Sequence, residues 1–145
     1  MTAATRSRER WIAVGQSSEA DAWAAGAAAT RQALDGGAEG RLLVVFCSEA
    51  YDLEALLAGI NQASGGVPLV GCSTAGEIAT SGPGDASVVV VALGGTGYSV
   101  NTAVATGVSA RLREAGAEAA ACIEGVDDKP HRIVLLLTDG LAGDQ

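Results

Sequence analysis

Apolar and polar positions along the chain follow two patterns, one typical of buried strands and one typical of helices. Apolar runs within residues 11–14, 42–46, 67–70, 87–93 and 132–137 predict strands. Runs that are apolar at every position need cover on both faces, as central strands of an α/β sheet have. Residues 98–106 alternate instead, so we expect them to form a half-exposed strand that pairs with 87–93 as an antiparallel hairpin.

Three segments between these runs have helical spacing. Ser18 is the expected N-cap of the first helix, with Asp21 in the capping-box position, and Asp52 is the expected N-cap of the second. A third helix is expected within residues 108–123. The apolar faces of the first two helices are formed by Trp23, Ala27, Thr30 and Leu34 and by Leu53, Leu56, Leu57 and Ile60.

The resulting order, β-α-β-α-β-β-β-α-β, predicts an α/β fold: a mostly parallel mixed sheet with helices packed on it and an antiparallel hairpin insert. Residues 1–10 are interpreted as a flexible arm and residues 11–145 as one domain. The last predicted strand is followed by a short polar stretch, where this pattern calls for a covering helix. We therefore expect the domain to be truncated at its C-terminus; a free tail is the alternative.

The net charge and the cysteine content argue against several classes of function and partner. A net charge of −8 disfavours nucleic acid and anionic membranes as partners, and no apolar run approaches a transmembrane length. No apolar segment of a secretory signal follows the first ten residues, which favours a cytoplasmic protein. Cys47, Cys72 and Cys122 are far apart without a CxxC pair, so neither a disulfide scaffold nor a zinc ribbon is expected, and we expect no cofactor.

Ligands of open α/β sheets bind beyond the carboxyl ends of the strands, so the residues that follow the predicted strands are the candidate site. The relevant segments are 15–17, 47–49, 71–77 and 138–140, which gather on one rim if their strands are parallel. The candidate ligand-binding residues are, in order of preference, Gly71, Cys72, Ser73, Thr74, Ala75, Gly76 and Glu77, then Ser48 and Tyr51, then Asp139 and Gly140.

The segment 71–77 is the densest of these. Its small residues permit close backbone approach, and the amides of a turn that opens a helix form a nest for an anion. In this hypothesis the amides of 72–75 hold a ligand carboxylate, and Glu77 or Asp139 holds an ammonium group. The structural alternative is a tight turn whose small residues serve packing alone.

The stretch Val-Gly-Cys-Ser-Thr-Ala-Gly-Glu-Ile at 70–78 resembles the signature of FIST domains, which are sensory modules of signal-transduction proteins. Residues 42–52, 88–93 and 135–143 resemble further parts of that family in the same order. The resemblance implies a cytoplasmic domain that senses a small polar ligand such as an amino acid. It also implies a downstream signalling domain or protein as partner, and a chain that covers the N-terminal part of the family.

Other functions remain open at this point. Cys72 follows a strand and a glycine, as the nucleophile in the elbow of a hydrolase does. The one histidine, His131, is expected at the start of its strand, so the two residues would lie at opposite ends of the sheet if their strands are parallel. Cys47, Cys72 and Asp139 match no familiar metal spacing. An interaction module without a small ligand is the third possibility. We expect no catalysis by this chain.

Overall fold

The computed structural model describes residues 10–35, 39–79, 82–84, 86–125 and 130–138. Residues 1–9 of the expected arm lie outside the described residues. The chain divides into two compact units, Met1–Val100 and Asn101–Gln145, which are described separately below.

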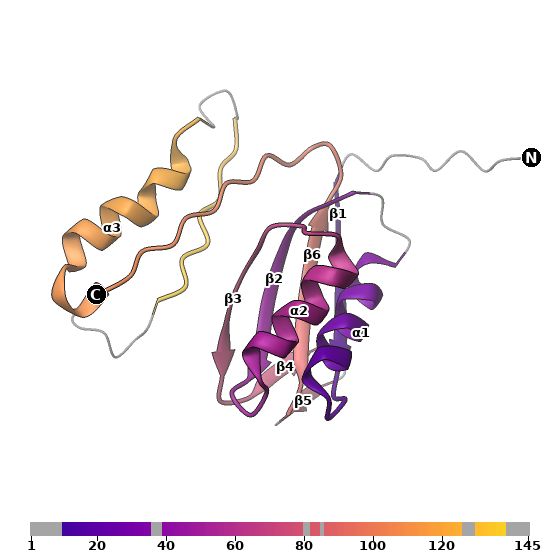
Figure 1. Ribbon diagram of the computed structural model, residues 1–145. Coiled ribbons are helices and arrows are strands. Elements are labelled where there is room, and N and C mark those ends of the chain that lie inside the picture. The colour runs from indigo at the N-terminus through magenta and orange to yellow at the C-terminus, as the bar shows by residue number, and fades with distance from the viewer. Residues whose placement is uncertain (1–9, 36–38, 80–81, 85, 126–129, 139–145) are drawn as a thin grey trace, which may run out of the picture. The chain divides into compact units, whose positions relative to one another are not determined.

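The first unit is built on a four-stranded sheet in the order β1-β6-β2-β3 (Figure 1). Its strands are β1 (Trp11–Ser17), β2 (Gly40–Ser48), β3 (Leu69–Thr74) and β6 (Val88–Gly94). β2 and β3 are parallel, and β6 is antiparallel to both of its neighbours, β1 and β2. β1, β2 and β3 therefore run in one direction with β6 opposed between two of them. The predicted α/β fold with a mixed sheet is confirmed.

The antiparallel hairpin lies elsewhere in the chain than predicted. It is formed by β4 (Glu77–Ala79) and β5 (Gly82–Gly84), which make a separate two-stranded sheet. The expected strand at 98–106 was wrong: that segment has no regular structure. The reason is that β1 and β2 occupy both edges of β6, which leaves no edge for a further strand.

Two helices, α1 (Ala22–Leu34) and α2 (Leu53–Ser64), lie over the same face of this sheet (Figure 1). Their close packing depends on small residues. A Cβ atom at Gly59 of α2 would lie 2.1 Å from the carbonyl oxygen of Trp23 in α1. The core between helices and sheet contains Ala25, Ala29, Ala33, Leu43, Val45, Cys47, Leu56, Ile60, Val88, Val90 and Ala92.

The starts of the two helices test the predicted caps. Asp52 caps α2 as expected, because its carboxylate accepts the amide hydrogens of the first turn. The prediction that Ser18 caps α1 was wrong: Asp21 is the N-cap and accepts from the Ala24 amide at 2.8 Å. The buried face of α1 is formed mainly by alanines, and Trp23, which was expected on that face, is 40% exposed. No helix in the described ranges is long and apolar enough to cross a bilayer.

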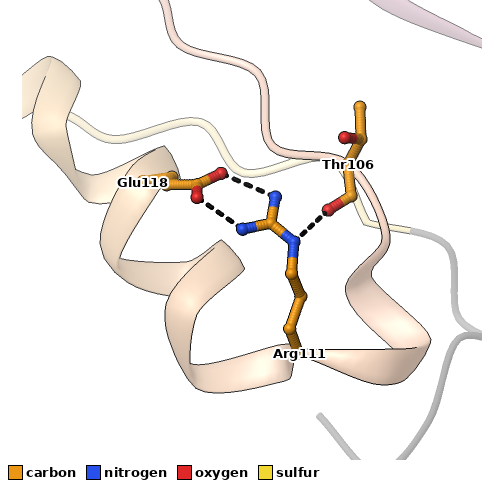
Figure 2. A network of polar contacts seen from close by, with 3 residues as sticks. All are labelled: Thr106, Arg111 and Glu118. Carbon is orange, nitrogen blue, oxygen red and sulfur yellow. Dashed lines mark hydrogen bonds and ion pairs between the residues drawn. The ribbon is translucent and has the colours of Figure 1, made fainter.

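The described residues of the second unit contain one α-helix, α3 (Leu112–Ala120), between the short 3-10 turns η1 (Val108–Ala110) and η2 (Ala121–Ile123). Figure 2 shows the polar contacts at its start. Arg111 forms a two-pronged ion pair with Glu118, and its Nε donates to the carbonyl of Thr106 at 2.9 Å. This guanidinium therefore ties the helix to the preceding loop. The predicted third helix is confirmed.

The last predicted strand is wrong within the described residues. Residues 132–137 have no regular structure, and Ile133 is 96% exposed. A continuous apolar run indicates only that a segment is suited to burial. Such a run forms a strand only where it pairs with another strand, and the described sheets do not include residues 132–137.

Candidate functional site at the strand ends

Three of the four predicted strand ends meet at one rim of the first unit. β1 ends at Ser17, β2 at Ser48 and β3 at Thr74, and these strands run in the same direction. β6 begins there as well, since Val88 aligns with Ser17 on one side and Cys47 on the other. The fourth predicted segment, residues 138–140, belongs to the second unit. Its candidates Asp139 and Gly140 lie outside the described residues.

The segment Gly71–Glu77 has a different backbone from the expected one. Residues 71–74 complete β3, Ala75 and Gly76 form an exposed turn, and Glu77 starts β4. The expected helix after this turn was wrong, so no helix N-terminus contributes to anion binding. Gly71 is explained by packing, since a Cβ there would lie 2.1 Å from the carbonyl oxygen of Val45 in β2.

Glu77 is the most deeply placed charged group at the rim, with 3% of its surface exposed. Its Oε1 accepts from the hydroxyl of Thr74 at 2.8 Å. Its Oε2 accepts from the amide and the hydroxyl of Ser87, at 3.2 and 3.1 Å. The carboxylate therefore links the end of β3 to the start of β6. Within the described residues it has no ion pair with a lysine, arginine or histidine.

Tyr51 and Ser48 hold the loops around this carboxylate. The Tyr51 hydroxyl lies 2.8 Å from the carbonyl oxygen of Glu19 and 3.3 Å from that of Ala86, so its one hydrogen is shared between two loops. The buried Ser48 hydroxyl accepts from the Ala50 amide at 3.2 Å. The structure thus brings both candidates to the rim with Glu77, and gives each a role in shaping it.

The negative charge of Glu77 acts on its neighbours. Burial is the main cause that raises the pKa of the Cys47 thiol, and the negative charge of Glu77 raises it further. Burial likewise raises the pKa of the Tyr51 phenol, with Glu77 as the next cause. Both groups therefore stay neutral at physiological pH. The rim combines one buried carboxylate with neutral hydroxyl and thiol groups, a set that suits a cationic ligand group.

Cys47 and Cys72 lie on adjacent strands of the sheet and differ in exposure. Cys47 is buried in the core, while Cys72 is exposed and aligns with Phe46, so their side chains leave opposite faces of the sheet. The chain's one histidine, His131, belongs to the second unit. Across the described ranges no three His, Cys, Asp or Glu side chains are placed to hold a metal ion.

Ser87 is a rim residue that sequence reasoning missed. It is 1% exposed and supplies two of the three hydrogen bonds to Glu77. The sequence places it at the start of the β6 run, and residues before a strand were not considered as site residues. Since β6 is antiparallel to its neighbours, its beginning lies where their ends lie. Ser87 could have been identified only by knowing that β6 runs antiparallel to its neighbours.

Comparison with known families matches residues 41–145 to the family described as FIST N domain. This range contains all of β2 except its first residue, β3, β6 and the segment Gly71–Glu77, together with Ser48 and Tyr51. No curated protein gives a match to the chain.

Proposed function

The chain belongs to the FIST N domain family, whose members are sensory domains of signal transduction, and from that premise we propose that it senses a small polar ligand with an ammonium group at the strand-end rim. An amino acid is the simplest ligand of this kind. The sensing takes place in the cytoplasm, involves no catalysis by this chain, and is passed on to a downstream signalling domain or protein.

The buried carboxylate of Glu77 carries this proposal. A charged group in the interior is costly unless hydrogen bonds and an opposite charge compensate it. Glu77 has three hydrogen bonds from neutral groups, and the described residues give it no cationic neighbour. From the described residues its Oε1 accepts one bond, so with respect to them it retains the capacity for a second donor. An ammonium group would supply both the missing donor and the missing charge.

The exposed turn after β3 supplies the other half of the site. Ala75 and Gly76 lie directly between the strand end and Glu77, and both are exposed. In the proposed complex their backbone amides hold the ligand's carboxylate, in place of the wider set 72–75, because Cys72 and Thr74 lie within the β3 ladder. Ser48 and Tyr51 hold the surrounding loops. A ligand with both charges, separated as in an α-amino acid, fits this arrangement.

The test is a thermal-shift screen of the chain against amino acids, small carboxylates and nucleotides. A ligand at 100 times its Kd adds about 2.7 kcal/mol of stability, which corresponds to several degrees. Glu77→Gln keeps the shape of the side chain and removes its charge. It should weaken an ammonium ligand by about 1.5–3 kcal/mol, the value of a charge-assisted hydrogen bond. Equal binding to the parent and to Glu77→Gln would contradict the proposed role of this carboxylate.

Cys72→Ala is the matched control for the enzymatic alternative. In the proposed sensor the Cys72 thiol makes no covalent bond, so the variant should retain ligand binding. Loss of a hydrolytic activity in this variant would support the hydrolase instead. If no compound in the panel shifts the melting temperature, an interaction module becomes the better description of the chain.

A further inference from the structure

The Thr74 hydroxyl lies between two oxygen atoms that can accept its hydrogen. Its Oγ1 lies 2.8 Å from Oε1 of Glu77 and 3.3 Å from the carbonyl oxygen of Gly76. A hydroxyl has one hydrogen, which rotates about the bond between carbon and oxygen, and two lone pairs that accept hydrogen bonds. Thr74 therefore donates to one of the two oxygens at a time, and the shorter distance and the negative charge favour the carboxylate.

The two oxygens of the Glu77 carboxylate differ in their surroundings. Oε2 accepts from the amide and the hydroxyl of Ser87, a residue that is 1% exposed. Oε1 accepts from Thr74, which is half-buried and directly precedes the exposed turn of Ala75 and Gly76. The Oε1 side is therefore the side from which a ligand reaches this carboxylate. It is also the side on which the hydrogen of a hydroxyl can turn away, to the Gly76 carbonyl.

We infer that the Thr74 hydroxyl selects the kind of cation that binds at the rim; the inference rests on the function proposed above. When a ligand nitrogen donates to Oε1 of Glu77, the Thr74 hydrogen turns to the Gly76 carbonyl, and Oγ1 accepts a second N–H of the same nitrogen. The ligand class is therefore primary and secondary ammonium compounds, whose cationic nitrogen carries at least two hydrogens. Tertiary and quaternary ammonium compounds, such as fully methylated amino acids, are selected against.

The exchange of hydrogen bonds favours such a ligand. When the Thr74 hydrogen turns, a bond to a carboxylate is replaced by a bond to a neutral carbonyl, which is the weaker of the two. The ligand adds two bonds from a charged donor, one to Oε1 and one to Oγ1, and these outweigh that loss. A quaternary ammonium group compensates the charge of Glu77 but donates no hydrogen. The number of N–H groups, at constant charge, is therefore the quantity that separates selection by Thr74 from attraction by charge alone.

Calorimetric titration of the full chain with a methylated series of one amino acid tests this selection. Glycine, N-methylglycine, N,N-dimethylglycine and N,N,N-trimethylglycine share one net charge and carry successively fewer N–H groups. Glycine and N-methylglycine should bind with similar Kd values, because both can donate twice. N,N-dimethylglycine should bind at least about tenfold more weakly, since it lacks one charge-assisted hydrogen bond, and N,N,N-trimethylglycine more weakly still. Equal binding of all four, or an equal loss with every added methyl group, would overturn the inference.

Two variants of Thr74 assign the selection to its hydroxyl. Thr74→Val removes the hydroxyl at nearly constant shape, so glycine should bind at least about tenfold more weakly while N,N-dimethylglycine is unaffected, and the step between them disappears. Thr74→Ser keeps the hydroxyl and should keep the step. An equal loss for all four compounds in Thr74→Val would show a purely structural role and refute the inference. If that variant does not fold, the series in the parent still decides.

The same titrations separate this inference from the function on which it rests. Glycine binding that Glu77→Gln weakens, but that does not depend on the number of N–H groups, would overturn the role of Thr74 and leave the proposed carboxylate site intact. If none of the four compounds binds to the parent, or if Glu77→Gln leaves every Kd unchanged, both the proposed function and the inference fail.

Discussion

The hydrogen bond from the Ser87 hydroxyl to Glu77 offers a quantitative test of the rim. Ser87 is buried, and its hydroxyl lies 3.1 Å from Oε2. Ser87→Ala removes this donor while the Ser87 backbone amide keeps its own bond to the same oxygen. A hydrogen bond to a charged group contributes about 1.5–3 kcal/mol, against about 0.5–1.5 kcal/mol for a neutral pair. We therefore expect Ser87→Ala to lower the free energy of unfolding by about 2 kcal/mol.

The charge dependence follows from a double-mutant cycle with Glu77→Gln. In that background the acceptor is neutral, so Ser87→Ala should cost about 1 kcal/mol and the coupling energy should be about 1 kcal/mol. The glutamine can be accommodated because the Thr74 hydroxyl has a second acceptor, the Gly76 carbonyl at 3.3 Å. The Thr74 hydroxyl can then donate its hydrogen to the Gly76 carbonyl and accept a hydrogen bond from the side-chain amide of the glutamine.

Urea unfolding followed by tryptophan fluorescence measures these differences. Both tryptophans, Trp11 and Trp23, lie in the first unit, so the signal reports the unit that contains the rim. The m-values of the four proteins should agree, which would show that the unfolding reaction is unchanged. A Ser87→Ala cost that is equal in the two backgrounds, or below about 0.5 kcal/mol in the parent, would refute a buried, charged Glu77 held by this hydroxyl.

Three further predictions concern the packing and the second unit. Thr30→Val should raise the free energy of unfolding by about 1 kcal/mol in a urea titration, because the buried Thr30 hydroxyl has no hydrogen-bond partner among the described residues; a loss of stability would argue that it has one. Gly59→Ala should cost about 1–3 kcal/mol despite the better helix propensity of alanine, since the added methyl collides with the backbone of α1; unchanged unfolding would contradict this contact between α1 and α2. Hydrogen bonding to Arg111 lowers the pKa of Glu118, so the stability that this ion pair adds is present above the ordinary glutamate pKa and is lost as the pH falls through the lowered value. Helicity of α3 measured by NMR should follow that acid transition, and Arg111→Gln should remove the dependence.

Much of the first unit could be predicted because local chemistry decides it. The runs that became β1, β2 and β6 are apolar at nearly every position, and the Asp52 cap uses a side chain that satisfies the amides of its own first turn. The segment Gly71–Glu77 could be selected because the carboxyl ends of strands carry ligand sites. The predicted cap at Ser18 failed because Asp21, three residues later, offers a carboxylate to the same helix.

Pairing between distant segments could not be predicted in this way, because an apolar run specifies burial and leaves the choice of neighbour to the whole chain. β6 lies between β1 and β2, which is why 98–106 forms no hairpin with it. That position also brings Ser87 to Glu77 and converts an exposed-looking carboxylate into a buried one. The sequence by itself determined which residues suit strands, helices and a polar rim. The tertiary structure alone decided which of them meet, since the bonds of Ser87 to Glu77 and of Tyr51 to the carbonyls of Glu19 and Ala86 join segments that are distant in the chain.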